Sequence, residues 1–567
     1  MKRGAVEIRI GLGSCGIASG AEAVRDVLQQ AGDVKTVGCN GMCYREPLVQ
    51  VVEPGGRVTF YSNVTVETAR LLVRRHFRAD YKSAAGYHPA PQNQKRIVLE
   101  NCGEIDPLNI DDYLARDGYR ALERCRTQLS PEQVIAAIAD SGLRGRGGAG
   151  FPTARKWALG RAQADPVKYV VCNGDEGDPG AFMDRAVLES DPHRVLEGLA
   201  IAAYAIGAAE GYLYIRAEYP LAVRHVRAAI VQARERGYLD SLHLEVREGA
   251  GAFVCGEETA LVQSLEGKRG MPRLRPPYPV EQGFRGKPTI INNVETLACV
   301  PWIIRHGPEA FAAFGTRASR GTKVFALAGK TNRGGLVEVP MGVTIRQVVE
   351  GIGGGIKNGR QFKAVQLGGP SGGCIPARLA DTPIDYDALA QTGAIMGSGG
   401  LVVLDDRDCM VDIARFFLKF TQAESCGKCT FCRIGTKRML EILDRLCEGN
   451  GRRDDLEKLE TLADYVSRGS LCGLGQTAPN PVATTLRYFR EEYEAHLREK
   501  RCPAGRCPAL IRYRVTDNCI GCTLCAQACP VGAIAYRPYE KHAVDERLCT
   551  RCDMCRQVCQ DDAVEVT

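Results

Sequence analysis

The run of cysteines at 426, 429 and 432, in the segment ESCGKCTFC, constrains this chain more than any other feature. Two residues separate each thiol from the next, so one short loop can hold three corners of an iron–sulfur cube, and a fourth thiolate must come from elsewhere. Neither this run nor a single distant partner is typical of zinc. Cys472, in the segment SLCGLG, is the candidate partner. The pattern predicts a [4Fe-4S] cluster on Cys426, Cys429, Cys432 and Cys472.

Residues 519–567 contain two further copies of such a run. The first has cysteines at 519, 522, 525 and 529, and the second has them at 549, 552, 555 and 559. This is the two-cluster ferredoxin pattern, in which the fourth cysteine of each run ligates the cluster of the other run. We therefore predict one [4Fe-4S] cluster on Cys519, Cys522, Cys525 and Cys559, and another on Cys549, Cys552, Cys555 and Cys529.

The 25 cysteines in 567 residues admit a second interpretation, a disulfide scaffold. Such scaffolds are usually short, and the bunched thiols favour metal centres. The net charge of +7 is small for this length, and the longest apolar run, residues 199–209, is shorter than the roughly 20 residues of a membrane span. The first residues lack the apolar core of a signal peptide. We expect a multidomain cytoplasmic protein with no nucleic-acid partner and no direct membrane insertion.

Residues 1–78 are predicted to form a first unit. Three thiols, Cys15, Cys39 and Cys43, fall in its turns. The Ala, Gly, Pro and polar residues at 79–96 are typical of a linker. The expected elements of the first unit are a strand at 6–10, a helix at 21–30 and a hairpin at 47–52 and 58–61. Two isolated thiols further on, Cys102 and Cys125, are interpreted as buried side chains.

A glycine-rich loop follows a helix that Ser130 caps and Gly142 ends. Residues 145–150 satisfy G-x-G-x-x-G, although a helix precedes them where a dinucleotide-binding fold has a strand. Successive glycines expose backbone N–H groups that can cradle a phosphate. A flexible hairpin tip is the alternative. The cations beside the loop are Arg144, Arg146 and Lys156.

Acidic and amide residues follow predicted strands further along. A buried strand at 168–172 leads into NGDEGDPG at 173–180, and a strand at 242–246 leads into GAGAFVCGEET at 249–259. Helices at 196–209 and 221–236 alternate with these strands, so the region is expected to be α/β. Ligands bind beyond the carboxyl ends of such strands, where acidic groups suit ribose hydroxyls and repel a 2′-phosphate. The pattern favours NAD over NADP, with a solvated acidic turn as the alternative.

The remaining segments predict a small sheet and a helical bundle. Strands are expected at 323–328, 335–339 and 364–367, with a helix at 344–350. Amphipathic segments at 410–420, 435–447, 454–467 and 481–496 surround the first cysteine run. His496, Cys502 and Cys507 can hold structural zinc if a fourth ligand comes from elsewhere. Unligated linker thiols are the alternative.

Five motifs together carry a family resemblance: GLRGRGGAGFPT at 142–153, CNGDEGDPGAF at 172–182, GAGAFVCGEETAL at 249–261, GKPTIINNVET at 286–296 and ESCGKCTFC at 424–432. Residues 130–500 resemble the NADH- and FMN-binding subunit of complex I and of soluble NAD-linked hydrogenases and formate dehydrogenases. Asp178 stands where complex I members usually carry Glu, and Tyr278 where they carry Phe. The first departure leans towards the hydrogenase and formate dehydrogenase branch. The appended ferredoxin also resembles the β subunit of multimeric hydrogenases, some of them electron-bifurcating.

The resemblance implies a multidomain α/β and α+β architecture. A thioredoxin-like module at 1–78 is joined through a linker and connecting segment at 79–129 to a Rossmann-like FMN/NADH domain at 130–320. A β-grasp domain at 321–405, a helical-bundle [4Fe-4S] domain at 406–500 and a two-cluster ferredoxin at 501–567 complete the chain. The module resembles [2Fe-2S] ferredoxins that use C-x4-C and C-x3-C pairs. Cys39 and Cys43 supply the second pair, but Ile10 stands at the position of the missing partner of Cys15. A cluster with a non-cysteine fourth ligand and an empty module both stay open.

The resemblance also implies the cofactor contacts. Hydride transfer needs no acid–base residue, so Asp178 and Glu258 are expected to position the nucleotide and not to react. The implied FMN residues are Gly145, Arg146, Gly147, Gly148, Gly150, Lys156, Asn173, Asp175, Glu257, Asn292, Asn293 and Thr296. The implied NADH residues are Phe151, Glu176, Asp178, Glu258 and Tyr278.

The expected activity is electron transfer between NAD(H), FMN and a chain of iron–sulfur clusters in a multisubunit complex. Expected partners are a thioredoxin-like [2Fe-2S] subunit, a catalytic hydrogenase, formate dehydrogenase or related subunit, and ferredoxin. Alternatives within the same class are the equivalent subunit of a formate dehydrogenase, an acyl-CoA-reducing complex or a complex I-like enzyme. A cluster-bearing scaffold without flavin activity is the alternative from a different class.

Overall fold

The computed structural model describes residues 6–30, 32–53, 56–77 and 94–566. The chain divides into two compact units. The first comprises residues 1–359, 364–403 and 471–474, and the second comprises residues 360–363, 404–470 and 475–567. Most of the predicted linker at 79–96 lies outside the described residues.

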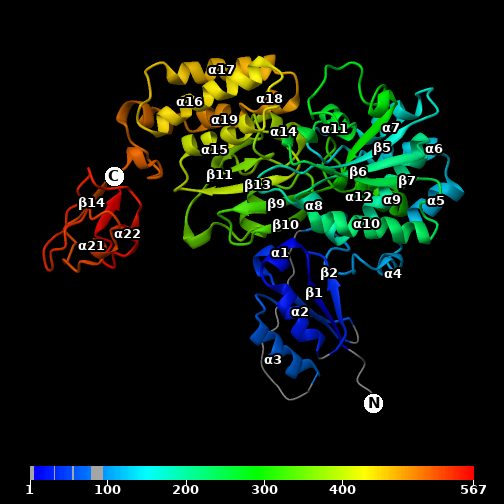
Figure 1. Ribbon diagram of the computed structural model, residues 1–567, viewed down its shortest axis with the longest axis horizontal. Coiled ribbons are helices and arrows are strands. Elements are labelled where there is room, and N and C mark those ends of the chain that lie inside the picture. Colours follow the sequence, from blue (N-terminus) through cyan, green and yellow to red (C-terminus); the bar gives the residue numbers. More distant parts are fainter. Residues whose placement is uncertain (1–5, 31, 54–55, 78–93, 567) are drawn as a thin grey trace. The chain divides into compact units, whose positions relative to one another are not determined.

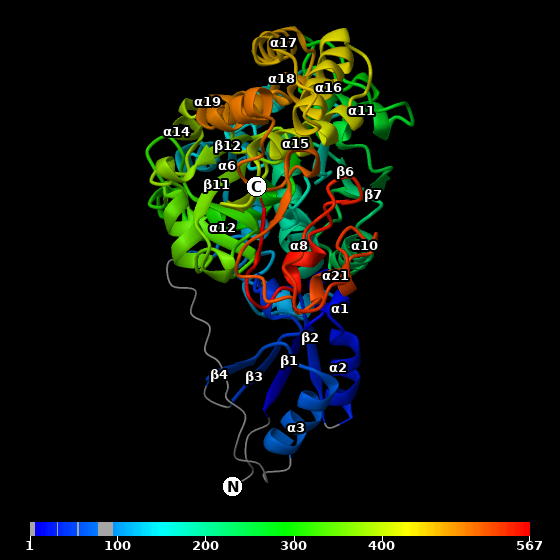
Figure 2. The same ribbon diagram turned by 90° about the vertical axis from the view of Figure 1, so that its left-hand side faces the viewer.

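The N-terminal module of the first unit is a four-stranded mixed sheet in the order β2-β1-β3-β4 (Figure 2). β1 pairs in parallel with β2 and antiparallel with β3, which pairs antiparallel with β4. Ile8 and Ile10 of β1 are wholly buried in its core. The elements are β1 Glu7–Gly11, α1 Ser14–Ala18, α2 Ala21–Gln29, β2 Val34–Val37, β3 Val49–Val52, β4 Val58–Tyr61 and α3 Val66–Phe77. The strand, helix and hairpin expected in this unit are present.

Residues 97–129, predicted as a connecting segment, are part of the core of the first unit. Ile97, Val98 and Leu99 are wholly buried, and their N–H groups donate to the carboxylate of Glu338 at 2.9–3.0 Å. Two helices, α4 Ile110–Leu114 and α5 Arg120–Gln128, follow. Cys102 and Cys125 are buried, as predicted.

The central sheet of the first unit is parallel, in the order β7-β6-β5-β8. Figure 1 labels β5, β6 and β7 of this sheet. Its strands are β5 Tyr169–Gly174, β6 Glu210–Arg216, β7 His243–Gly249 and β8 Thr289–Asn293. Its helices are α6 Pro131–Ser141, α7 Thr153–Arg161, α8 Met183–Ser190, α9 Pro192–Ile206, α10 Pro220–Glu235, α11 Glu258–Leu265, α12 Val294–His306 and α13 Pro308–Ala312. The carboxyl ends of β5 and β8 adjoin, so residues following these strands meet at one edge.

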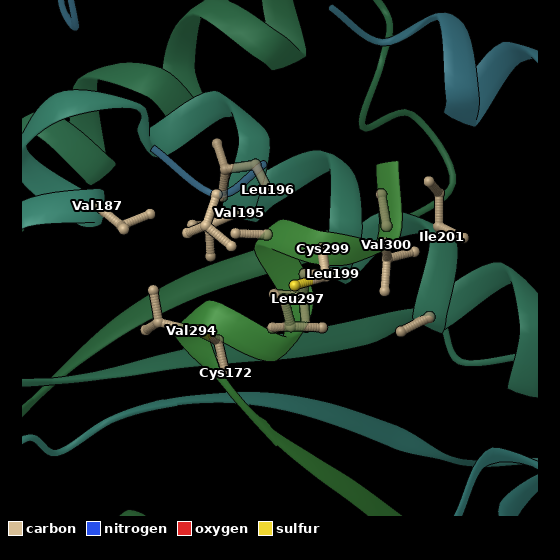
Figure 3. Packing of buried hydrophobic residues seen from close by; sticks show 14 of the residues in the cluster. Cys172, Val187, Val195, Leu196, Leu199, Ile201, Val294, Leu297, Cys299 and Val300 are labelled. Atoms are coloured by element: carbon tan, nitrogen blue, oxygen red, sulfur yellow. The ribbon is translucent and has the colours of Figure 1, made fainter. Parts of the chain in front are cut away.

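Helices α9 and α12 form the middle of this core. Figure 3 shows Val195 and Leu199 of α9 near Leu297 of α12, and all three are buried. A Cβ on Gly198 would lie 2.1 Å from the carbonyl oxygen of Leu297, so only glycine permits the two helices to approach so closely.

A second, five-stranded sheet in the first unit has the order β10-β9-β13-β11-β12. Its elements are β9 Thr322–Gly329, β10 Gly335–Pro340, β11 Phe362–Leu367, β12 Gly373–Pro376, α14 Tyr386–Gln391 and β13 Gly400–Asp405. The three predicted strands are present, and β12 and β13 had not been predicted. The expected helix at 344–350 is a helical turn at Gln347–Ile352.

The second unit is a helical bundle followed by a small sulfur-rich domain. The packed helices are α15 Met410–Ala423, α16 Thr436–Cys447, α17 Asp455–Gly469 and α19 Asn480–Tyr488 (Figure 1), and they match the four amphipathic segments. α18 Gly473–Thr477 and α20 Arg490–Glu494 are short. The small domain has β14 Tyr513–Val515 paired antiparallel with β15 Val564–Val566, and helices α21 Leu524–Ala528 and α22 Met554–Gln557. Among the described helices, none has both the length and the apolar character that crossing a membrane requires.

Candidate functional site

The glycine loop packs against the carboxyl end of β8. A Cβ on Gly147 would lie 3.0 Å from Cβ of Asn293, and one on Gly148 would lie 3.1 Å from the carbonyl carbon of Gly397. Gly148 has a φ of 126°, which residues with a side chain rarely adopt. Gly147 and Gly148 therefore pack so closely against the neighbouring chain that a side chain at either position would have to displace it.

Arg146, within the loop, and Arg144, just before it, both donate to backbone carbonyl groups around the loop. Arg146 is wholly buried, and its guanidinium donates to the carbonyl oxygens of Thr322, Arg144 and Arg320 at 2.6–3.0 Å. Arg144 donates to the carbonyl of Gly150 at 2.7 Å, and its guanidinium lies 4.2 Å from the ring centre of Tyr386. Both cations hold the loop in place, which differs from their expected role of adding positive charge beside a phosphate.

Lys156, in the first turns of α7, is held in place by two polar contacts. Its ammonium group forms an ion pair with Glu258 and donates to the carbonyl of Ile291 at 2.9 Å. The neighbouring Glu257 caps α11, because its carboxylate accepts the N–H groups of Thr259 and Ala260 at 2.9 and 3.0 Å. Lys156 and Glu258 thus form one polar pair at this edge of the sheet.

Three asparagines at the strand ends are fixed in orientation by the chain. The side-chain oxygen of Asn292 accepts the indole N–H of Trp157 at 2.9 Å. Asn293 caps α12 through its oxygen, and its amide nitrogen donates to Asp184 at 2.5 Å. Asn173 donates to the carbonyl of Gly256 at 3.0 Å and accepts the N–H of Asp175 at 3.0 Å. The N–H of Arg146 donates to Thr296 at 2.8 Å and links the loop to α12.

Asp175 and Glu176, in the acidic turn after β5, are buried. The carboxylate of Glu176 accepts the N–H groups of Asp184 and Arg185 at 3.1 Å each, at the start of α8. Burial raises the pKa of Glu176 to about 7 and that of Asp178 to about 6, and it raises the pKa of Asp184 well above the ordinary value. Ser398 donates to Asp178 at 2.5 Å. At neutral pH the turn therefore carries less negative charge than its sequence indicates.

The two aromatic residues among the expected NADH contacts are exposed. Phe151, at the end of the glycine loop, is 41% exposed, and Tyr278 is 49% exposed. Arg155 lies over the ring of Phe151 and Arg275 over that of Tyr278. Large exposed aromatics offer flat apolar faces on which a planar ring can stack.

The three thiols of the N-terminal module gather at its contact with α8. The sulfurs of Cys39 and Cys43 lie 3.7 Å apart. A hydrogen bond from Cys43 lowers the pKa of Cys15 to about 7. Ser14 donates to Glu189 of α8 through its N–H at 2.9 Å and through its hydroxyl at 2.5 Å. The thiols therefore lie at one end of α8, and the buried carboxylate of Glu176 lies at the other.

The cysteine run of the helical bundle precedes α16. The hydroxyl of Ser425 lies 3.3 Å from the sulfur of Cys432, and Gly427 has a φ of 79° that lets the loop turn. A Cβ on Gly475 would lie 3.0 Å from Cβ of Cys432. Cys472, three residues before Gly475, is buried.

A compact set of four donors lies in the second unit: Cys409, His496, Cys502 and Cys507 are all buried, with their donor atoms within 4.8 Å of one another. Nε2 of His496 lies 3.3 Å from the sulfur of Cys409 and 3.4 Å from that of Cys507. Nδ1 of His496 lies 2.7 Å from the carbonyl of Glu492, which orients the ring. Sequence reasoning missed Cys409, because it lies 87 residues before His496 and belongs to no spaced pair.

The small sulfur-rich domain has two cavities, each lined by four cysteines. Cys519, Cys522, Cys525 and Cys559 line one, and Cys529, Cys549, Cys552 and Cys555 line the other. Each cavity therefore takes three cysteines from one run and the fourth from the other. Four thiols around one small cavity suit a [4Fe-4S] cluster.

Three family models match the chain. The Nuo51 FMN-binding domain matches residues 138–302. The NADH-ubiquinone oxidoreductase-F iron-sulfur binding region matches residues 412–496, and a 4Fe-4S dicluster domain matches residues 514–566. The matches fall on the parallel-sheet domain, the helical bundle and the sulfur-rich domain.

Similar proteins cover most of the chain. It is 53% identical over 460 residues to the NADP-reducing hydrogenase subunit HndC of Solidesulfovibrio fructosivorans, an alignment that covers 80% of this chain and 94% of that one. It is 44% identical over 415 residues to the F 2 subunit of the NADH-quinone oxidoreductase of Rhizobium meliloti (strain 1021), covering 72% and 99%. A chain in the crystal structure of the NAD+-reducing [NiFe]-hydrogenase in the H2-reduced state superposes with a TM-score of 0.65 and 34% identity, over 87% of this chain and 84% of that one. The chain therefore belongs to the family of FMN- and iron–sulfur-binding, NAD(H)-dependent oxidoreductase subunits that includes the F subunits of NADH-quinone oxidoreductases.

Proposed function

We propose that this chain carries electrons between NAD(H) and iron–sulfur clusters by way of FMN, as one subunit of a hydrogenase-type complex. FMN, when bound, exchanges an electron pair with the nicotinamide and single electrons with the clusters. The observation that carries the proposal is the meeting of the glycine loop, the acidic turn and three oriented asparagines at the carboxyl edge of β5 and β8. That edge is where open parallel sheets bind their ligands.

The chain's part at this edge is to bind and orient FMN. The backbone of the glycine loop suits a phosphate because successive glycines expose N–H groups, and the glycines also let the loop pack closely against Asn293 and Gly397. Lys156 supplies the nearby cation, and its pairing with Glu258 fixes its position. We assign the flavin contacts to these groups together with Asn173, Asp175, Glu257, Asn292, Asn293 and Thr296. Arg146 belongs to the support of the loop, because its buried guanidinium donates to three carbonyl groups.

Phe151 and Tyr278 are the proposed stacking surfaces for NADH, with Asp178 and Glu258 around its polar groups. The buried carboxylate of Glu176 accepts two N–H groups at the start of α8 and supports the turn. We propose NAD(H) over NADP(H), because carboxylates at this edge disfavour an added phosphate. The name of the relative from Solidesulfovibrio fructosivorans specifies NADP, so the activities of this chain with NADH and with NADPH have to be compared. The expected result is a kcat/KM for NADH at least tenfold above that for NADPH, and the reverse ratio would contradict the assignment.

Three [4Fe-4S] clusters are proposed. One uses Cys426, Cys429, Cys432 and Cys472, and the two others use the four-cysteine sets that line the cavities of the C-terminal domain. We also propose a [2Fe-2S] cluster on Cys15, Cys39 and Cys43, supported by their gathering at the end of α8. Exchange of Cys39 for Ser should then lower the iron content of the reconstituted chain.

The set formed by Cys409, His496, Cys502 and Cys507 is the proposed structural zinc site. Three thiols and one imidazole nitrogen are donors that tetrahedral structural zinc prefers. Cys409 is the fourth donor, which the sequence analysis did not identify, and all four side chains are buried. Such a site would join the segment before α15 to the segment after α20.

The partners are proposed to be other iron–sulfur subunits: a thioredoxin-like [2Fe-2S] subunit, a catalytic hydrogenase or related subunit, and ferredoxin. The names of the relatives, which denote subunits, support this. The named domains, a thioredoxin-like module, a Rossmann-like domain, a β-grasp domain, a [4Fe-4S] bundle and a two-cluster ferredoxin, remain our interpretation of the sheets and helices described above.

The test is an anaerobic preparation of the full chain with FMN and reconstituted clusters. Addition of NADH should bleach the flavin absorbance and then reduce a viologen or ferricyanide. A chain that takes up iron but binds no FMN after reconstitution would contradict the proposal and favour a cluster-bearing scaffold.

A further inference from the structure

His542 is a buried polar side chain that has no part in the electron route proposed above. It is 4% exposed, and it lines the same cavity as Cys519, Cys522, Cys525 and Cys559. Its Nδ1 lies 3.6 Å from the sulfur of Cys519, a distance that suits a hydrogen bond to the large sulfur atom. Its Nε2 is buried and has no hydrogen-bond partner among the described residues. The imidazole therefore directs its polar contact to a proposed cluster ligand.

The segment that carries His542 is fastened to the rest of the small domain on both sides. Before it, the N–H of Tyr539 donates to the carbonyl of Gly521 at 3.0 Å, within the first of the two cysteine runs. After it, Val544 pairs with Ile534 in an isolated β-bridge. These contacts hold the backbone of His542 in place, so its ring is positioned by the fold of the domain.

The two cavities of the domain differ at this point. The two cysteine runs are 30 residues apart, which makes Arg512 the counterpart of His542. The side chain of Arg512 is 71% exposed. Cys549, the counterpart of Cys519, accepts a backbone N–H, that of Arg551 at 3.4 Å. No histidine is among the described residues that line the cavity of Cys549. A side-chain donor to a ligand sulfur is thus a feature of the other cavity.

The imidazole has to act as the donor towards Cys519 when a cluster is bound. A cysteine that ligates iron is a thiolate, which accepts hydrogen bonds and has no proton to give. A neutral imidazole has one N–H and one bare nitrogen, and the hydrogen bond that it makes decides which is which. Nδ1 of His542, which faces the sulfur, then carries the proton, and the partnerless Nε2 is the bare nitrogen.

Such a donor favours the reduced form of the cluster. Reduction adds one electron and transfers no atom, and the added negative charge is shared by the iron and its sulfur ligands. Hydrogen bonds to the sulfurs are one of the factors that set the reduction potential of an iron–sulfur cluster. Burial strengthens the interaction, because water does not screen it. Loss of the donor should therefore lower the reduction potential.

We propose that His542 donates its Nδ1–H to the thiolate of Cys519 and thereby raises the reduction potential of the [4Fe-4S] cluster on Cys519, Cys522, Cys525 and Cys559. This inference rests on the cluster proposed above for this cavity. His542 is a positioning residue, because it acts on the cluster through a ligand and carries no electron itself.

The experiment uses the full chain, reconstituted anaerobically with iron and sulfide and titrated with dithionite. Neither FMN nor NADH takes part, so a failure of the proposed flavin route does not affect the result. His542→Leu removes the donor, and His542→Gln keeps a neutral N–H at this position. His243→Leu, the same exchange at an exposed histidine of β7, is the matched control. The readouts are iron per chain, the midpoint potential of each cluster EPR signal, and pulsed EPR of the wild-type chain that contains 15N-labelled histidine.

We expect His542→Leu to lower the reduction equilibrium constant of one cluster about tenfold, which is about 59 mV for one electron, and to leave the other clusters unchanged. His542→Gln should recover most of this loss, because its amide N–H can replace the imidazole. His243→Leu should match the wild type. In the labelled chain, histidine nitrogen should couple to one reduced cluster, and Cys519→Ser should remove this coupling together with the iron of that cluster.

Wild-type potentials in His542→Leu would overturn the assignment. Equal losses in the Leu and Gln variants would also overturn it, since packing and not a hydrogen bond would then be the cause. If His542→Leu loses iron or does not fold, the labelled wild-type chain decides, and the absence of histidine coupling to every reduced cluster would overturn the assignment. Unchanged iron content in Cys519→Ser would instead remove the cluster itself, and the assignment with it.

Discussion

The small C-terminal domain and the buried set of Cys409, His496, Cys502 and Cys507 are both sulfur-rich, and both lie in the second unit. The sulfur-rich domain takes the four cysteines of each cavity from two runs of fixed spacing, so the sequence alone predicted which cysteines share a cavity. The other set draws one ligand from before α15 and three from after α20. Ligand spacing reveals a site that one loop forms, whereas helix packing has to bring together a site with distant ligands.

The largest effect is expected from Cys409→Ser. Structural zinc can contribute about 10 kcal/mol or more to folding, so loss of one ligand should release the metal and lower the melting temperature of the second unit by roughly 10 °C or more. Zinc content and thermal denaturation measure this. The control is Cys447→Ser, a buried thiol near Cys507 that is not one of the four donors. Metal loss from the control with metal retained in Cys409→Ser would contradict the ligand set.

Paired substitutions test the exchange of ligands in the ferredoxin. Cys559→Ser and Cys519→Ser should damage the same cluster, so the double variant should lose little more iron than either single variant. Cys559→Ser combined with Cys529→Ser should damage both clusters, about doubling the iron loss. Iron analysis with EPR distinguishes these outcomes. Independent, additive losses for the Cys559 and Cys519 pair would show that each run keeps its own fourth cysteine.

The proposed FMN site at the carboxyl edge of β5 and β8 resembles the set of four metal donors, because both draw on segments distant in the sequence. The shape of its glycine loop can be tested by adding one methyl group. Gly148→Ala forces a side chain into a φ of 126° and against Gly397, at a cost of about 1–2 kcal/mol. FMN affinity, measured by fluorescence titration, should fall roughly tenfold. Gly145→Ala is the matched control, because a Cβ there would lie at an ordinary 3.5 Å from its nearest neighbour. Equal losses of FMN affinity in both variants would mean that the backbone shape of the loop at Gly148 is not the cause.

The smallest effect concerns the buried acidic turn. The pKa of Glu176 in the folded chain, about 7, lies above its ordinary 4.5, so its neutral form stabilises the fold and this stabilisation is lost as pH rises from about 4.5 to 7. Glu176→Gln should therefore gain stability relative to the wild type over this window, by about 1–3 kcal/mol. Urea denaturation followed by tryptophan fluorescence measures it, since both tryptophans, Trp157 and Trp302, lie in this domain. A pH-independent difference would contradict the raised pKa.

Elements with a strong local signal were predicted from sequence. Ser130 and Gly142 bound α6 as expected, with the full capping box at its start and a left-handed residue at its end. The four helices of the bundle follow their apolar periodicity. Strands β12 and β13 were missed because they are short or flanked by glycine, and their identity depends on pairing with distant strands.

In the candidate site, too, only the features with a local sequence signal could be predicted. The residue types and their order along the chain could be predicted, and the direction of each side chain could not. Arg146 turns inward because three carbonyl groups satisfy its guanidinium, and Glu176 turns inward because the start of α8 offers two N–H groups. Cys409 had no spacing signal, since it meets the other three donors only after folding.

The central claim is that NADH electrons reach the iron–sulfur clusters through FMN on this chain. Its most direct test is an anaerobic NADH titration of the full chain, followed by flavin absorbance and by low-temperature EPR of the clusters. We predict loss of flavin absorbance and appearance of reduced-cluster signals in the FMN-loaded chain, and neither in the same chain stripped of FMN. Cluster reduction by NADH at the same rate without FMN, or bleached flavin with clusters that stay oxidised at every NADH concentration, would contradict the account.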